Sequence, residues 1–272
     1  MSNICSISSK DERTISMKRA INLTLLIFLV LMAGCATAPL REEPLIPAKR
    51  SVEQYAIPEK QQAFYVYDPW EPMNRRIYNF NAVFDEYVFL PVVGAYEFVL
   101  PDFAQTGVTN FFNNLGEISN LMNSLLQFKI IKCFNTIGRI GLNTTIGLGG
   151  LIDVATHAGV KRENEDFGQT LGFYGLGPGP YLIVPVAGPY NLRDATGWVV
   201  DIVAYNLVMN QLYRELAIKN KTKDYVNWGL LALFAIDKRH KYSFRYFMTS
   251  SPFEYEIIRK LYQIQREFLI EH

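Results

Sequence analysis

The stretch from Gly141 to Gly188 constrains the fold most, because it is rich in glycine and proline and yet apolar. It contains eleven of the chain's eighteen glycines, together with Pro178, Pro180 and Pro185. Glycine adopts positive φ without penalty, and proline fixes φ and removes a hydrogen-bond donor. The stretch is therefore predicted to be neither one long helix nor a regular strand. Loops usually lie on the surface and are polar, so an irregular apolar segment needs a protein core or a lipid to lie against.

The N-terminus has the three parts of a secretory signal peptide. Basic residues follow Met17, the apolar run Ala20–Ala33 comes next, and a small-residue site ends at Cys35. The apolar run is shorter than the roughly 20 residues that a membrane-spanning helix needs. Its end resembles a bacterial lipobox, with Met32 where leucine is usual, so Cys35 is expected to carry a lipid. The alternative is an ordinary signal peptide or a buried helix.

The domain organisation follows from this reading. Residues 1–34 are predicted to be a signal peptide, with Met17 as the expected true start. Residues 35–66 are predicted to be the lipidated cysteine and a proline-rich flexible linker. Residues 67–272 are predicted to form a single domain. A net charge of +1 gives no footprint for nucleic-acid binding.

Hydrophobic spacing predicts a mostly helical fold in which no strand stands out. Ile77, Phe80, Phe84 and Val88 share one face of a helix that Pro91 is expected to end. Apolar residues also recur at helical spacing in three longer segments, which are about 109–137, 191–217 and 252–269. The segment Val226–Ile236 is apolar all round and too short to span a bilayer, so it is predicted to be a buried or membrane-embedded helix.

Several ordered motifs resemble one known family. The run from Asp68 through Trp70, Asn74 and Arg75, followed by Tyr78-Asn79-Phe80-Asn81, resembles the opening motif of the MlaA/VacJ outer-membrane lipoproteins. The glycine-rich stretch is similar to the family's central motifs. These are Leu142-Asn143-Thr144, Gly147-Leu-Gly149-Gly150-Leu-Ile-Asp153, Asp166-Phe167-Gly168 and Tyr174-Gly175-Leu-Gly177. The match is strong over roughly residues 65–200, whereas the region 214–248 diverges.

The resemblance implies a fold and a function. Family members form a mostly helical ring of amphipathic helices, embedded in the periplasmic leaflet of the outer membrane around a central channel. They pass misplaced phospholipids from the outer leaflet to a periplasmic lipid carrier of an ABC transporter system, and they associate with a trimeric porin. The resemblance implies no cofactor. The alternative function is a structural or adaptor lipoprotein of porins that transports nothing.

Two groups of residues become site candidates on this resemblance. Polar and aromatic residues of the first helix are expected to line the channel, although the same side chains could face bulk solvent on any amphipathic helix. They are Asn74, Arg75, Asn79, Phe80 and Asn81. Glycines of the central stretch are expected to allow close backbone packing (Gly147, Gly149 and Gly150) or to gate the channel (Gly175 and Gly177). The alternative for Gly175 and Gly177 is a tight turn.

Catalysis is not expected, because the sequence has none of the serine-hydrolase, zinc-protease or nucleotide-binding motifs. A hydrolase would have to use Cys133 with His157 and Asp153, and a buried structural thiol is the commoner role for such a cysteine. The histidines His157, His240 and His272 do not have ligand spacing, so no metal site is predicted.

Overall fold

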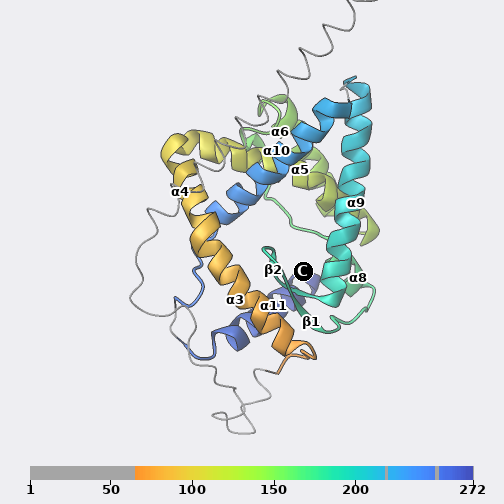
Figure 1. The fold of residues 1–272 in the computed structure, drawn as a ribbon. Helices are drawn as coiled ribbons and strands as arrows, with labels where there is room; N and C mark the ends of the chain where they lie inside the picture. The colour runs from red at the N-terminus through yellow and green to blue at the C-terminus, as the bar shows by residue number, and fades with distance from the viewer. Residues whose placement is uncertain (1–64, 218–219, 249–250, 272) are drawn as a thin grey trace, which may run out of the picture.

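The computed structural model describes residues 65–217, 220–248 and 251–271 (Figure 1). The predicted signal peptide, Cys35 and all but the last two residues of the predicted linker lie outside the described residues. The described chain is mostly helical, as the sequence predicts. Within these residues, none of the helices combines the length and the apolar character needed to cross a bilayer.

The first half of the described chain forms five helices joined by short connections. Glu71 and Pro72 suit the first turn of the opening helix, because an acidic side chain favours a helix N-terminus and proline needs no N–H there. The helices are α3 (Glu71–Phe84), the π-helical turn η2 (Asp85–Phe89), α4 (Leu90–Val99), α5 (Asp102–Leu126) and α6 (Ile130–Thr145).

Two predicted boundaries in this half are wrong. The helix does not end at Pro91. It continues through the π-helical turn η2 into α4, and Pro91 lies in the first turn of α4. The segment 109–137 is not one helix. Phe128 adopts a φ of 55° between α5 and α6, so the chain turns there and the two helices pack against each other.

The glycine-rich stretch contains more regular structure than the sequence predicts. It holds two short helices, α7 (Val154–His157) and α8 (Phe167–Phe173), and an antiparallel hairpin of β1 (Tyr181–Val184) and β2 (Gly188–Asn191). Tyr181 pairs with Asn191 and Val184 pairs with Gly188. The strands escape sequence patterning because each has four residues, prolines flank β1 and Pro189 lies within β2. The remainder of the stretch is irregular, as expected.

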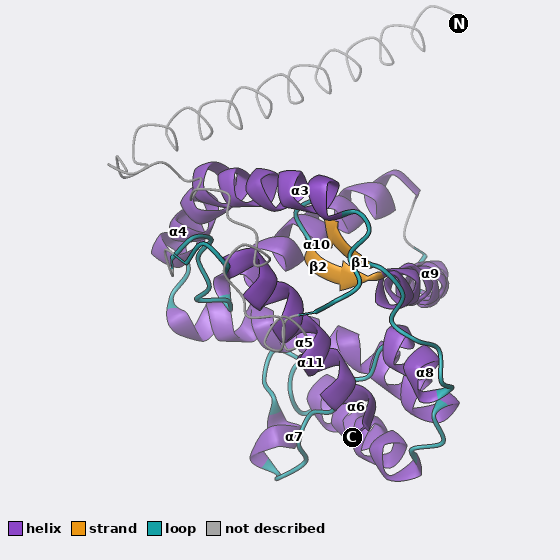
Figure 2. Ribbon diagram, turned by 90° about the horizontal axis from the view of Figure 1, so that it is seen from below, coloured by secondary structure: helices purple, strands orange, loops and turns teal. Residues whose placement is uncertain are grey.

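Three helices complete the chain, and the elements then surround the hairpin. They are α9 (Leu192–Glu215), α10 (Asn220–His240) and α11 (Glu254–Glu271). In Figure 1, α3, α4, α10 and α9 follow one another around the edge of the view, and the hairpin reaches inward between α3 and α9. Figure 2 shows from below that the hairpin lies beside α3 and α9.

A small aromatic core joins the two ends of the described chain. Tyr78 of α3, Tyr181 and Ile183 of β1, and Tyr255 of α11 form a buried cluster. Two phenol hydroxyls of this core donate hydrogen bonds to carboxylates: Tyr78 donates to Glu254 and Tyr255 donates to Asp68. The hairpin is therefore fixed between the first and last helices of the fold.

Candidate functional site

The distribution of polar and apolar side chains is inverted relative to that of a water-soluble domain. Among the described residues, twenty-two polar or charged residues are buried against twelve apolar ones. Asp, Glu and Arg are almost never fully buried in soluble proteins unless they are paired. Large apolar side chains are at the same time exposed along most of the helices. Such an exterior marks a surface that meets lipid or protein.

Helix α6 shows the inversion most clearly. Its buried residues recur at spacings of three, three and four and so form one stripe, and three of the four are polar. They are Cys133, Thr136, Arg139 and Asn143. Apolar residues on the rest of its surface, which include Ile131, Phe134 and Ile137, are exposed. The helix is thus amphipathic with its polar face inward.

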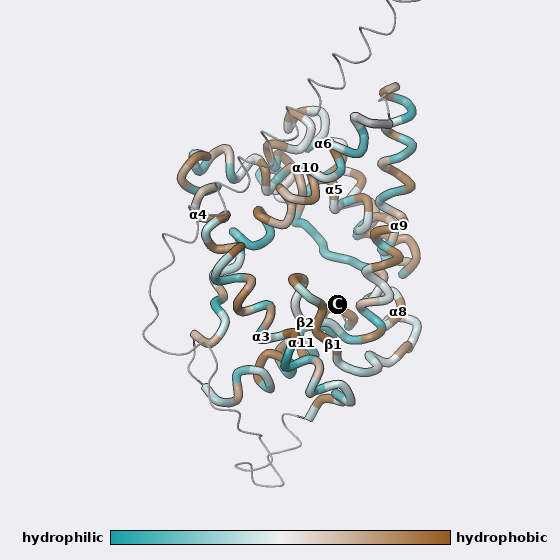
Figure 3. Tube along the Cα trace, viewed as in Figure 1, coloured by the Kyte–Doolittle hydropathy of each residue, from teal (hydrophilic) through white to brown (hydrophobic). Residues whose placement is uncertain are grey.

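The apolar segment of α10 is not buried, which corrects one of the two predictions made for it. Trp228, Leu231 and Phe234 are exposed, as are Val199, Ile202 and other apolar residues of α9. Figure 3 shows hydrophobic positions spread along the outer helices and at the end of the hairpin.

Two asparagines of α3 hold the hairpin. The amide of Asn74 donates to the Tyr181 carbonyl at 3.1 Å and accepts from the Ile183 N–H at 2.9 Å. Two helical turns later, Asn81 donates to the Val184 carbonyl at 3.1 Å and accepts from the Val186 N–H at 2.7 Å. Each amide thus replaces a missing strand neighbour, and the seven-residue spacing places both on one face of the helix.

The predicted channel-lining residues consequently separate into two groups. Asn74 and Asn81 are 0% and 3% exposed, so they attach the hairpin and have no free surface with which to line a path. Arg75 binds Glu71 and Glu256 and covers the Tyr255 ring at 4.2 Å. Asn79 is half-buried, and Phe80 is 51% exposed and stacks on Phe84. For Asn79 and Phe80 a lining role stays a prediction.

A buried arginine organises the helices α5, α6 and α7. The Arg139 guanidinium donates to Glu117 at 2.7 Å, to both oxygens of Asp153 at 3.1 and 3.0 Å, and to the Val160 carbonyl at 2.6 Å. Asn143 donates to Asp153 from the next turn of α6. Both carboxylates and the guanidinium are compensated, which a charge at this depth requires. The sequence offered one signal for this hub, a single arginine in the middle of an amphipathic helical segment.

The hub controls the ionisation of Asp153. Burial alone would raise the pKa of this carboxyl, but hydrogen bonds from Thr156, Arg139 and Asn143 lower its pKa from 3.8 to about 2. A folded-state pKa below the unfolded value stabilises the fold above pH 4, and this contribution is lost as the pH falls towards 2.

We expect Asp153→Asn to remove this part of the acid sensitivity. At pH 7 the variant should be less stable than the unmodified chain by about 2 kcal/mol, and the difference should shrink between pH 4 and pH 2. Urea unfolding in mild detergent across this pH range measures both curves. Asp224→Asn changes an exposed carboxylate of α10, and its stability should depend on pH in the same way as that of the unmodified chain. A constant difference between Asp153→Asn and the unmodified chain would contradict the assignment.

A second hub joins α8, α9 and α11. Arg266 donates to Asp166 at 2.6 and 2.7 Å and binds Asp194 at 2.8 Å. Tyr262 also donates to Asp194. The helices can approach because of glycine: a Cβ on Gly197 would lie 2.3 Å from the backbone nitrogen of Gly168. The signal for this hub was absent from local sequence, because its partners lie up to 100 residues apart.

The glycines of the central stretch differ in what they permit. A Cβ on Gly147 would lie 2.3 Å from the Ile152 carbonyl oxygen, and one on Gly150 would lie 2.6 Å from Asn114, so both suit the predicted close packing. Added Cβ atoms on Gly149, Gly175 and Gly177 would meet nothing.

The loop that carries Gly175 and Gly177 is exposed and attached at both ends. Tyr174 donates to the Leu126 carbonyl at 2.6 Å. Arg193 donates through its side chain to the Leu176 carbonyl at 3.3 Å and through its backbone to the Pro178 carbonyl. The gate assigned to Gly175 and Gly177 stays a prediction.

The geometry around Cys133 does not form a nucleophile–base pair with Asp153 as orienter. Burial raises the pKa of the Cys133 thiol, which disfavours the nucleophilic thiolate. The Asp153 carboxylate binds Arg139, Asn143 and Thr156, whereas His157 contacts the Asp153 backbone carbonyl at 2.7 Å. In the described part of the chain, no group of three or more His, Cys, Asp or Glu residues could hold a metal ion.

Comparisons with known proteins identify the family of this chain. A family model described as the MlaA lipoprotein matches residues 66–269. A Rickettsia typhi protein named only as uncharacterised is 32% identical over 76% of this chain and 79% of its own length. The Escherichia coli K12 "Intermembrane phospholipid transport system lipoprotein MlaA" is 41% identical over 138 residues, which cover 49% of this chain. The chain spans 55% of the length of that relative.

A solved structure is similar as well. It comes from work headed "Structural basis for maintenance of bacterial outer membrane lipid asymmetry", with a TM-score of 0.57 and 31% identity. The alignment covers 75% of this chain and 100% of that one. The family model covers well over half of the sequence, and a relative of similar length and a solved structure support the same assignment. The chain therefore belongs to the MlaA lipoprotein family.

Proposed function

We propose that this chain is an outer-membrane lipoprotein that removes misplaced phospholipids from the outer leaflet and passes them to a periplasmic lipid carrier, which maintains lipid asymmetry. The observation that carries the proposal is the inverted side-chain distribution: many polar side chains lie inside and large apolar side chains lie outside. The names of the E. coli relative and of the similar structure supply the class of cargo.

The apolar exterior supports embedding in one leaflet. Exposed Phe134, Trp198 and Leu231 belong to three different helices, α6, α9 and α10. Their burial in hydrocarbon is favourable by roughly 25 cal/mol per Å² of apolar surface removed from water. We infer that lipid covers this surface in the periplasmic leaflet and that the lipid on Cys35 anchors the chain beforehand. A trimeric porin is the proposed protein partner on part of the same surface.

The polar interior supports a path for headgroups. A charged headgroup crosses hydrocarbon only at high cost, and a polar lining lowers that barrier. The proposed path is an amphipathic channel that runs inside the frame of α3, α4, α10 and α9. No nucleotide-binding motif is present in the sequence, so transport through this chain is proposed to be passive and driven by partners.

The test uses the full chain in a Gram-negative host that lacks its own copy. We expect the deletion strain to accumulate phospholipid in the outer leaflet and the full chain to restore asymmetry. Labelling of surface-exposed phospholipid measures this, and mass spectrometry of the detergent-purified chain should detect bound phospholipid.

Two outcomes would count against the proposal. Unchanged surface phospholipid in the deletion strain would remove the transport role. Porin association without bound lipid or an asymmetry defect would identify the chain as a porin adaptor.

A further inference from the structure

Buried and half-buried arginines of the described chain are almost all neutralised by carboxylates. Arg139, Arg239 and Arg266 each bind at least one aspartate or glutamate. Lys238 is different: within the described residues it has neither an ion pair nor a hydrogen bond. Its neighbours in sequence have partners, because Asp237 binds Thr109 and Lys241, and Arg239 binds Asp85.

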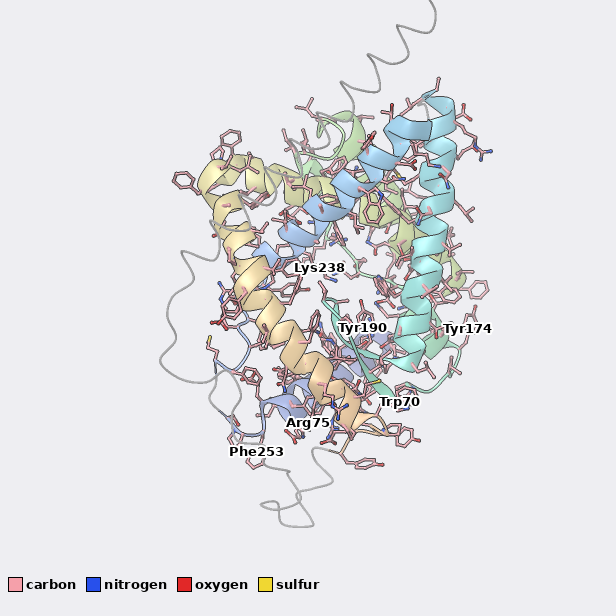
Figure 4. The ribbon with its side chains drawn as sticks, viewed as in Figure 1. Trp70, Arg75, Tyr174, Tyr190, Lys238 and Phe253 are labelled. Carbon is pink, nitrogen blue, oxygen red and sulfur yellow. The ribbon has the colours of Figure 1, made fainter. Side chains whose placement is uncertain are left out.

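The surroundings of Lys238 leave its side chain accessible without supplying a countercharge. The side chain is exposed, yet the surrounding protein lowers the pKa of its ammonium by desolvation, with no carboxylate to offset the penalty. Figure 4 places Lys238 at the lower end of α10, on the side that faces the hairpin and Tyr190.

The hairpin supplies an apolar partner for this cation. Its turn consists of Pro185, Val186 and Ala187, and Val186 is exposed with a φ of 66°. Asn81 fixes this turn through the Val186 N–H. Figure 3 shows the end of the hairpin as hydrophobic in the middle of the frame. One uncompensated positive charge and one apolar turn thus face the same interior, which matches a molecule with an anionic head and an apolar tail.

We propose that the Lys238 ammonium binds the phosphate of a phospholipid headgroup inside the frame, an assignment that rests on the proposed transport function. An incoming phosphodiester provides the missing countercharge, and its two non-bridging oxygens can accept from the ammonium donors. A lysine is a compact, strongly hydrated point charge with rotatable donors, whereas an arginine would hold the phosphate in a bidentate fork. A single point contact favours brief capture over tight retention, as a transport path requires.

The test compares lipids with and without a phosphate on the purified full chain. The chain is incubated in detergent with an equimolar mixture of phosphatidylglycerol and diacylglycerol of the same acyl chains, and retained lipid is measured by mass spectrometry. We expect the unmodified chain to prefer the phospholipid by about tenfold, as one charge-assisted hydrogen bond predicts. Lys238→Gln should lose this preference and still retain diacylglycerol, and Lys238→Arg should keep most of it.

The control is Lys161→Gln, which removes an exposed, unpaired lysine from the loop before α8 and should behave as the unmodified chain. A phospholipid preference that survives in Lys238→Gln overturns the assignment and leaves transport intact. An unmodified chain that retains neither lipid contradicts the transport function itself. Competition by millimolar inorganic phosphate as strong as that by phosphatidylglycerol would assign the site to free phosphate and overturn the lipid contact.

Discussion

Arg139→Met should lower the free energy of unfolding by about 3–5 kcal/mol, the cost of removing one partner from a buried ion pair. The substitution keeps most of the side-chain volume but leaves Glu117 without its closest cation. Glu117 is fully buried, and Arg162 approaches it only to 3.5 Å. Asp153 and the Val160 carbonyl also lose a donor. The expected loss is a large part of the stability of a typical domain.

The measurement is urea unfolding of the full chain in mild detergent, followed by far-ultraviolet circular dichroism. Arg214→Met is the matched control, because Arg214 is an exposed residue of α9; it should change stability by less than about 0.5 kcal/mol. Equal unfolding midpoints for Arg139→Met and Arg214→Met would show that the hub contributes nothing.

Asn74→Leu should lower the free energy of unfolding by about 2–4 kcal/mol. It should loosen the hairpin before the rest of the fold. Leucine has a similar size but cannot bond, so the Ile183 N–H and the Tyr181 carbonyl are left buried and unsatisfied at about 1–3 kcal/mol each. Asp68 also loses the donor that Asn74 provides at 2.8 Å. The effect should concentrate on β1, because the hairpin has only two strands and depends on α3 for the missing neighbour.

Hydrogen exchange separates this local effect from general destabilisation. The amide of Ile183 should lose protection in Asn74→Leu well before those of α5. Asn79→Leu is the control, since Asn79 lies on the same helix and is half-buried, whereas the hydrogen bonds to the hairpin come from Asn74 and Asn81. Uniform loss of protection in Asn74→Leu, or the same local loss in Asn79→Leu, would refute the clamp.

The sequence predicts the helices well and the orientation of their faces poorly. Apolar spacing locates α3, α9 and α11, because a period of 3.6 residues is a local property. The same spacing shows only that the two faces of a helix differ, and it does not tell which face lies inward. For α6 the polar face is inside, so the inward roles of Thr136, Arg139 and Asn143 could not be predicted, although Asn143 and Asp153 stand in family motifs.

The hairpin and the hubs were missed for a related reason. The strands β1 and β2 are stabilised by Asn74 and Asn81, more than 100 residues earlier in the chain. The hub on Arg266 joins α11 to α8 and α9 over a similar distance. Contacts of this kind leave no periodic trace in the sequence. Asn74 and Asn81 stand in the motif from which a channel-lining role was predicted, but both side chains are buried.

The inverted distribution also bears on how this protein should respond to temperature. The large positive heat capacity of unfolding, about 12–15 cal/mol/K per residue in water-soluble domains, comes from the hydration of newly exposed apolar surface. In this chain much of the apolar surface is already outside, and the interior that unfolding opens is largely polar, which lowers the heat capacity change. In a lipid or detergent environment the curve of unfolding free energy against temperature should therefore be flat, with a shallow maximum and little tendency towards cold denaturation.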